Sequence, residues 1–196
     1  MYVWVDFMPI YCMMYIIGVI VLKGKFNKTN TFIAMSSIMY IYILWVIKYT
    51  VFPIPYDEMS IDIFSSGVEW KNRINLIPFM VDCKFVLQKT MLLNILLTMP
   101  FGFGINFLHN KKFNVSNILI VGLLVGLILE GIQVVISLIL GFPYRYIDMT
   151  DCICNLSGCV VGFIAFLIFA KLWIVILGKL SLNNAIYKEI DCICKR

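Results

Sequence analysis

Long apolar stretches alternate with short polar ones along the chain. Each apolar stretch approaches the roughly 20 residues that an α-helix needs to cross a bilayer. The pattern predicts an all-α fold, a polytopic membrane bundle of about five transmembrane helices, built as a single domain over residues 1–196. We expect the crossings at residues 2–22, 31–52, 88–108, 117–140 and 146–177.

The longest polar stretch, residues 53–87, is expected to lie at the mouth of the bundle. It begins with Pro53 and Pro55, which end the preceding helix because proline has no backbone N–H to donate. The stretch mixes charged residues with apolar ones such as Trp70 and Phe79. This mixture is too apolar for a solvated linker, so we predict an outer interfacial or re-entrant segment.

The composition supports a membrane protein and argues against a nucleic-acid-binding one. The chain is 62% hydrophobic and 14% charged, whereas soluble domains are nearer half apolar and a quarter charged. The net charge is +5, but the basic residues stand beside apolar stretches and form no aromatic-basic motif. We therefore expect the lipid bilayer as a partner and no nucleic acid.

The basic clusters predict how the bundle is oriented. Residues 23–28, residues 111–112 and the C-terminal tail fall on one side of a five-helix bundle. Because Lys and Arg concentrate in cytoplasmic loops, we expect the N-terminus outside and the C-terminus in the cytoplasm. Residues 53–87 and the turn at 141–148 then lie outside.

Polar residues and glycines share one face of the last predicted helix. At about 100° per residue, Asp148, Asp151, Asn155, Gly158 and Gly162 fall within an arc of about 80°. The polar groups occupy the turns nearest the outer surface, and the glycines follow. Glycines on one face let a neighbouring helix approach closely, so this face should meet another helix.

The two preceding helices carry similar polar faces. Glu130 and Gln133 share a face with two glycines, and Asn94 begins a series of polar and small residues spaced by four. The short turn near Pro143 should make the last two helices antiparallel neighbours, so Glu130 and Asn155 should meet at similar depth. The candidate polar cluster comprises Asn94, Glu130, Gln133, Arg145, Asp148, Asp151 and Asn155.

These buried carboxylates favour a functional site, although a packing role stays open. An acidic residue inside a membrane costs at least about 2.5–3.5 kcal/mol unless it is paired or hydrated. Arg145 is the only cation near Glu130, Asp148 and Asp151 along this part of the chain. The cluster is therefore either a ligand site or a hydrogen-bonded clamp that fixes helix packing.

The cysteines do not predict a metal site. The motif "DCIC" occurs at residues 151–154 and again at 191–194, but its spacing differs from the C-x-x-C of zinc sites. The two copies should lie on opposite faces of the membrane. The lone His109 belongs to a basic loop, where a catalytic role is not expected.

Four motifs resemble those of the VanZ-like family of small bacterial membrane proteins. They are "NLIPF" at 75–79, N-x5-P-x-G from Asn94, E-x-x-Q from Glu130, and R-x2-D-x2-D-x3-N-x2-G from Arg145. The resemblance covers residues 40–170 or so and implies a multi-pass protein of the bacterial cell membrane. The family's founding member confers resistance to teicoplanin, a lipoglycopeptide that acts on cell-wall precursors outside the membrane.

Three functions remain open at this point. The first, which we favour, is a non-enzymatic envelope or resistance protein that binds a lipid-linked cell-wall precursor or a lipoglycopeptide, with no cofactor. The second is an enzyme acting on a polyprenyl or other lipid head group, with Mg²⁺ held by Asp148 and Asp151 and phosphate by Arg145. The third is a small transporter that uses Glu130.

Overall fold

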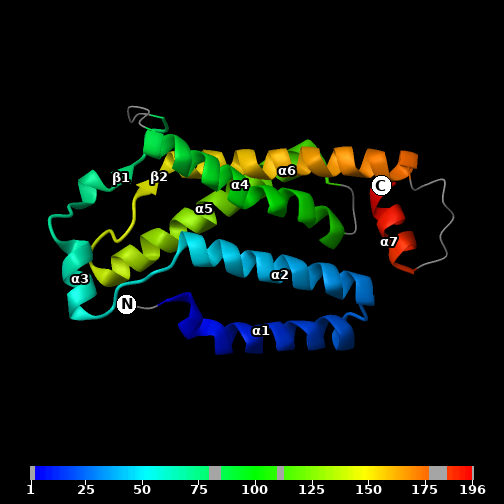
Figure 1. Cartoon of the computed structure of the whole chain (residues 1–196), viewed down its shortest axis with the longest axis horizontal. Helices are drawn as coiled ribbons and strands as arrows, with labels where there is room; N and C mark the ends of the chain where they lie inside the picture. Colours follow the sequence, from blue (N-terminus) through cyan, green and yellow to red (C-terminus); the bar gives the residue numbers. More distant parts are fainter. Residues whose placement is uncertain (1–2, 80–84, 110–112, 177–184, 196) are drawn as a thin grey trace.

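The computed structural model describes residues 3–79, 85–109, 113–176 and 185–195. Within these ranges five helices are long and apolar enough to cross a membrane, as the sequence predicts. They lie side by side as an elongated bundle (Figure 1). The candidate spans are Trp4–Lys25, Asn30–Thr50, Lys89–Leu108, Val115–Leu140 and Met149–Ile176.

The long helices begin and end where local sequence signals place them. The first span joins a 3-10 turn (Trp4–Phe7), α1 (Met8–Ile20) and a π turn (Val21–Lys25). The others are α2 (Asn30–Thr50), α4 (Phe85–Leu108), α5 (Val115–Leu140) and α6 (Met149–Ile176). The Thr29 and Asn114 side chains cap α2 and α5 by accepting backbone N–H groups of their first turns.

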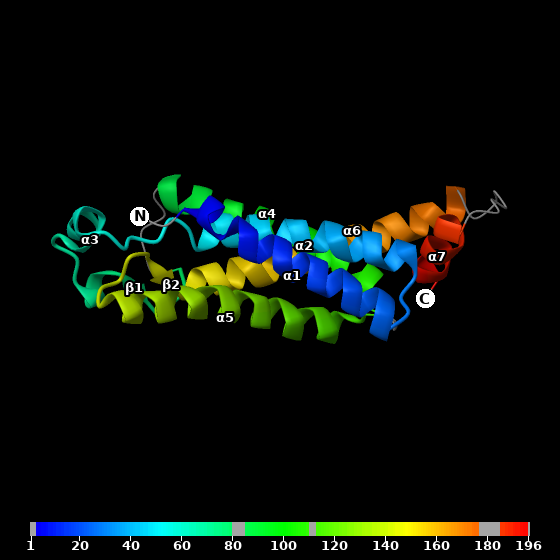
Figure 2. The ribbon, with the colours of Figure 1, turned by 90° about the horizontal axis from the view of Figure 1, so that it is seen from below.

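Two short helices lie at opposite ends of the bundle. The stretch expected at the mouth contains α3 (Glu58–Ser65), a 3-10 turn (Trp70–Asn72) and β1 (Ile74–Asn75). The helix α7 (Ala185–Cys194) lies at the other end in both views (Figures 1 and 2). The N-terminus is found at the α3 end and the C-terminus at the α7 end, as an odd number of crossings requires.

The core forms where α6 packs against α4 and α5. A Cβ atom added at Gly162 would overlap the Met99 carbonyl oxygen, and one added at Gly158 would overlap the Thr98 side chain. The two backbones therefore approach as closely as only glycine allows. The Thr98 hydroxyl lies 2.9 Å from the Asn155 carbonyl oxygen and ties α4 to α6. The glycine face predicted from the sequence is thus a helix-packing face.

The start of α6 differs from the prediction. The helix begins at Met149, and the two residues before it form β2 (Ile147–Asp148), which pairs in parallel with β1. Asp148 holds this geometry because its Oδ1 accepts the Thr150 backbone N–H at 2.7 Å. Placing Asp148 on the helical face was therefore wrong, since it precedes the helix.

Candidate functional site

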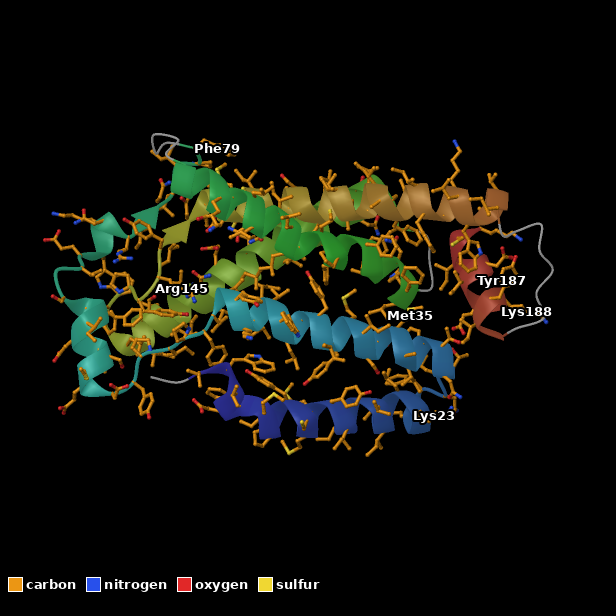
Figure 3. The ribbon with its side chains drawn as sticks, viewed as in Figure 1. Lys23, Met35, Phe79, Arg145, Tyr187 and Lys188 are labelled. Atoms are coloured by element: carbon orange, nitrogen blue, oxygen red, sulfur yellow. The ribbon has the colours of Figure 1, made fainter. Side chains whose placement is uncertain are left out.

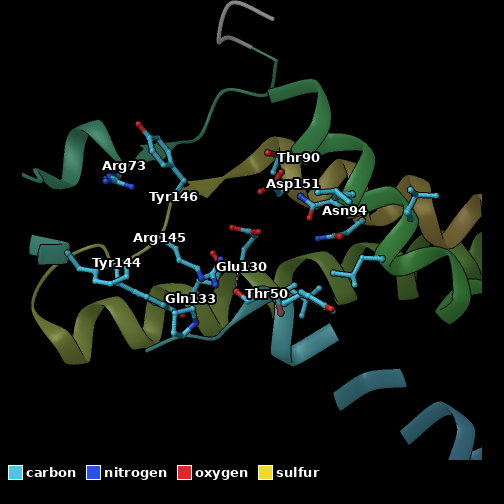
Figure 4. Close-up of a pocket in the computed structure, with 18 residues that line it drawn as sticks. Thr50, Arg73, Thr90, Asn94, Glu130, Gln133, Tyr144, Arg145, Tyr146 and Asp151 are labelled. Atoms are coloured by element: carbon cyan, nitrogen blue, oxygen red, sulfur yellow. Dashed lines mark hydrogen bonds between the residues drawn. The ribbon is translucent and has the colours of Figure 1, made fainter. Parts of the chain in front are cut away.

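A polar cavity of about 800 Å³ opens at the α3 end of the bundle (Figure 4). It lies where α2 and α5 end and α4 and α6 begin. Six of the seven predicted cluster residues line it, and Asp148 does not. Its polar and charged lining residues are Thr50, Arg73, Thr90, Asn94, Glu130, Gln133, Arg145, Asp151 and Asn155, with Tyr49, Tyr144 and Tyr146.

Helix α5 supplies Glu130 and Gln133, one turn apart and each 8% exposed. The Gln133 amide Nε2 donates to the Thr50 carbonyl oxygen at 3.2 Å. That carbonyl belongs to the last turn of α2, where backbone acceptors have no partner within the helix. Gln133 therefore fastens α5 to the end of α2 and forms one wall of the cavity.

Glu130 and Asn155 line the cavity from neighbouring helices, and each keeps a buried oxygen without a partner. The Glu130 carboxylate accepts the backbone N–H of Asp148, while its Oε2 has no hydrogen-bond partner among the described residues. The same holds for Oδ1 of Asn155, a residue only 3% exposed. Within that part of the chain no hydrogen bond joins the two side chains. Figure 4 shows Glu130 directed between Arg145 and Asn94.

Arg145 is held by a backbone carbonyl group, and among the described residues no ion pair joins it to a carboxylate. Its Nη2 donates to the Phe52 carbonyl oxygen, and the neighbouring Tyr144 hydroxyl donates to the Val51 carbonyl oxygen at 3.1 Å. Burial raises the pKa of the Tyr144 hydroxyl, so it stays protonated as a donor. The Arg145 Nε is buried without a partner among the described residues. The guanidinium thus has a donor without a partner among the described residues, beside the cavity.

Arg73 is a second cation of the cavity, which the sequence reasoning did not single out. Its guanidinium lies 4.7 Å from the ring centroid of Tyr146, and its carbonyl oxygen accepts the Ile147 N–H at 2.9 Å. The pairing of β1 with β2 brings this arginine to the cavity across more than 70 residues of sequence. Only its position two residues before "NLIPF" pointed toward it.

Asp148 braces the cavity from outside. Its Oδ1 accepts both the Asn75 amide at 3.2 Å and the Thr150 N–H. In turn Asn75 Oδ1 accepts the Ile77 N–H, and Thr150 Oγ1 accepts the Phe79 N–H, each at 3.2 Å. These bonds fasten the "NLIPF" segment to the start of α6. Asp148 therefore holds the loops that carry Arg73 and Arg145.

Asp151 occupies the cavity wall formed by α4 and α6. The Asn94 side chain donates a hydrogen bond to its carboxylate. Thr90, one turn before Asn94, lies beside the same carboxylate in Figure 4. The cavity therefore holds two carboxylates, Glu130 and Asp151, and two guanidinium groups. Such a lining can bind a ligand that carries both anionic groups and hydrogen-bond donors.

The two cysteine pairs lie at opposite ends of the bundle, and neither they nor His109 line the cavity. Cys152 and Cys154 are buried on α6, whereas Cys192 and Cys194 lie on α7 at the other end. His109 packs edge-on against the Phe113 ring at 4.9 Å. In the described ranges no group of three or more His, Cys, Asp or Glu side chains is placed to hold a metal ion.

A family model described as VanZ/LLP1 matches residues 39–170. This range contains every residue that lines the polar cavity. It also contains the β1–β2 pair and the glycines at which α4 and α6 meet. No match was found among curated proteins or among solved structures.

Proposed function

Because the chain belongs to the VanZ/LLP1 family, we propose that it is a bacterial envelope protein whose polar cavity binds the head group of a lipid-anchored molecule. The molecule is a lipid-linked cell-wall precursor or a lipoglycopeptide, bound at the outer face of the membrane. Occupation of the cavity alters the access of glycopeptides to their target and raises tolerance to teicoplanin. The chain needs no catalytic step for this function.

The unpartnered polar atoms around the cavity carry this proposal. Glu130 Oε2, Asn155 Oδ1 and Arg145 Nε are buried without partners among the described residues. Leaving a buried polar group unpaired costs about 1–3 kcal/mol, and more when the group is charged. A clamp that served only to pack helices would pair these atoms with one another. Their arrangement around an 800 Å³ space supports a ligand instead.

The charges of the lining favour a head group that contains phosphate. Arg73 and Arg145 both line the cavity, and guanidinium groups bind phosphate through paired hydrogen bonds. Glu130 and Asp151, which also line the cavity, accept hydrogen bonds, which suits the hydroxyl, amide or ammonium groups of a sugar or peptide. Lipid-linked cell-wall precursors combine both kinds of group.

Drug tolerance in a sensitive Gram-positive host tests the proposal. We expect expression of the chain to raise the inhibitory concentration of teicoplanin with little change for vancomycin, because the acyl chain of teicoplanin takes it into the outer leaflet. Asp151→Asn keeps the side-chain size, removes the charge, and should abolish the shift. Glu69→Gln removes an exposed carboxylate outside the cavity and should leave the shift intact. Equal shifts for wild type and Asp151→Asn would reject the cavity as the site.

A membrane enzyme acting on a lipid head group is the second candidate function. The unpartnered oxygen of Glu130, in a cavity that two arginines also line, favours it, since a carboxylate near a bound phosphate ester can accept a proton. Incubation of the purified protein with undecaprenyl diphosphate, followed by phosphate release and mass spectrometry of the lipid, distinguishes the two. The binding proposal expects unchanged lipid. Phosphate release by the wild type that is absent in Glu130→Gln would favour the enzyme.

A further inference from the structure

An apolar groove of about 450 Å³ follows the polar cavity along the seam between α2 and α4. Its walls come from both helices, and α6 contributes its floor. Its lining residues include Met39, Tyr42, Pro100, Phe103, Gly104 and Ala165. No ionisable acid or base lines it apart from the Tyr42 hydroxyl, which donates to the Leu97 carbonyl oxygen. The groove is therefore suited to hydrocarbon.

The face of α4 that lines the cavity also lines the groove further along the helix, and the Tyr42–Leu97 hydrogen bond crosses the seam between them. Leu93 and Leu97 line the cavity, and Pro100, Gly104 and Phe107 line the groove. Their spacing of four, three, four and three residues keeps them on one side of the helix. At 1.5 Å per residue this face is about 21 Å long. Cavity and groove are therefore consecutive parts of one face.

The facing side of α2 shows the same division. Tyr49 lines the cavity, whereas Tyr42 and Met35, seven and fourteen residues earlier, line the groove. A spacing of seven returns to the same face after two turns. The two helices run in opposite directions (Figure 1), so the polar and apolar parts of each face coincide. The seam is polar toward α3 and apolar toward the middle of the bundle.

Small and adaptable side chains keep the apolar part hollow. A Cβ added at Gly104 would overlap the Met39 methyl group, so even alanine there would displace the neighbouring side chain. Pro100 stands inside α4, where it removes a backbone hydrogen bond and bends the helix. Methionines adapt their shape to an irregular apolar partner. This lining fits a flexible chain better than a rigid ring system.

We propose that the groove holds the single hydrocarbon chain of a lipid phosphate whose head group occupies the polar cavity. The proposal rests on the proposed function for the head group and adds the class of ligand: a chain-borne phosphate that lies along the α2–α4 seam. The surrounding lipid tails are as apolar as the groove, so moving the chain from the bilayer into the groove adds little affinity. The chain instead fixes where the ligand lies. It aligns the phosphate with Arg73 and Arg145.

Photolabelling tests the proposal with two probes that share one chain. The probes are hexadecyl phosphate and hexadecanol, each with a diazirine at the middle of the chain, added to the full-length protein in phosphatidylcholine nanodiscs. We expect the phosphate probe to label residues 35–42 and 99–107 at least tenfold more than hexadecanol does. Arg145→Gln should reduce this labelling to the hexadecanol level, because the head group is no longer held.

Variants that fill the groove provide the second part of the photolabelling experiment. Ala165→Phe places a ring in the groove and should lower labelling of residues 35–42 and 99–107 at least tenfold. Ile168→Phe, on the same helix but 57% exposed and outside the groove, should leave labelling unchanged. If Ala165→Phe fails to accumulate, Ile38→Trp fills the groove from its rim.

Three results would overturn the inference. Equal labelling by the two probes, or labelling spread evenly over lipid-facing positions such as Leu124 and Ile128, would mean ordinary bilayer lipid occupies the groove. Labelling that Ala165→Phe and Ile38→Trp leave unchanged would place the chain elsewhere. Head-group-dependent labelling together with no teicoplanin shift would retain the lipid site and reject only the resistance phenotype.

Discussion

Glu130 has both a structural and a proposed ligand-binding role in the cavity. One side of its carboxylate accepts the Asp148 backbone N–H, and the other oxygen is buried without a partner among the described residues. The two roles separate by substitution. Glutamine retains an acceptor for the N–H and loses the acid, whereas leucine loses both.

We predict that Glu130→Gln unfolds within about 1 kcal/mol of wild type because the acceptor for Asp148 remains. Its teicoplanin tolerance should fall to that of cells without the protein. Glu130→Leu should lose tolerance and also about 1–3 kcal/mol of stability. Thermal unfolding in detergent and inhibitory concentrations at matched expression check both variants. Wild-type tolerance in Glu130→Gln would show that the acid group has no functional role.

Asp148 shows the opposite balance between stability and function. Its carboxylate fastens Asn75 and the first turn of α6 but lies outside the cavity. The sequence analysis placed Asp148 and Asp151 on one helical face, because a spacing of three residues brings two side chains to the same side of a helix. An aspartate that precedes a helix and is followed after two residues by another acid also resembles a helix cap, and that signal predicts its observed position.

We predict that Asp148→Ala lowers the free energy of unfolding by about 1–3 kcal/mol, because two donors lose their acceptor. Asp151→Asn should change stability by less than half of that, since the Asn94 hydrogen bond can be kept. Thermal unfolding of the two purified variants makes the comparison. A larger loss of stability for Asp151→Asn than for Asp148→Ala would contradict this assignment, because Asp151 would then be the structural aspartate.

The contact between α4 and α6 fixes the opening of the cavity, because these helices carry Asn94, Asp151 and Asn155. It depends on glycines that meet backbone atoms of the facing helix. At Gly162 an added methyl group would overlap the Met99 carbonyl oxygen, whereas at Gly131 on α5 it would meet nothing within 4 Å. The two glycines make a matched pair.

We predict that Gly162→Ala destabilises the bundle by about 1–3 kcal/mol, the usual effect of forcing a methyl group into a packed contact. Gly131→Ala should be neutral or stabilising by up to about 1 kcal/mol, because alanine favours the helix. Apparent melting temperatures in one detergent, measured side by side, test this. A similar change in both variants would mean that the close approach of α4 and α6 does not limit stability.

Hydrophobic length predicted the five long helices well, since a membrane span has to be long and continuous. It did not predict β1, β2 or the start of α6 at Met149. The pairing of Ile74 with Ile147 joins residues more than 70 positions apart, and nothing local indicates it. Arg73 entered the cavity through that pairing, so it was missed for the same reason. The glycine faces were predictable because they follow the helical repeat.

The whole molecule has a polar end and a basic end. The cavity, α3 and the N-terminus lie at one end, and α7 lies at the other. Figure 3 shows Arg145 at the first end and Lys23, Tyr187 and Lys188 at the second. The Thr29 hydroxyl donates to Glu189 at 2.7 Å and joins the start of α2 to α7. The orientation of these ends across the membrane stays a prediction from the basic clusters.

Thiol labelling in intact cells checks that orientation. In a background without the other cysteines, we predict that Ser66→Cys at the end of α3 reacts with an impermeant thiol reagent. Cys192, which is exposed on α7, should react only after the membrane is permeabilised. The reverse pattern would put the cavity on the cytoplasmic side and remove extracellular precursors as its ligands.

The central claim is that the space between Arg145 and Glu130 binds a head group. The most direct measurement is an electron cryomicroscopy structure of the full-length protein extracted with its native lipids into nanodiscs. We predict density for a phosphate-bearing head group in contact with the Arg145 guanidinium and the Glu130 carboxylate, continuing as a chain between α2 and α4. A closed cavity in which Glu130 and Asn155 bond to each other, or a cavity that holds only water, would contradict the account.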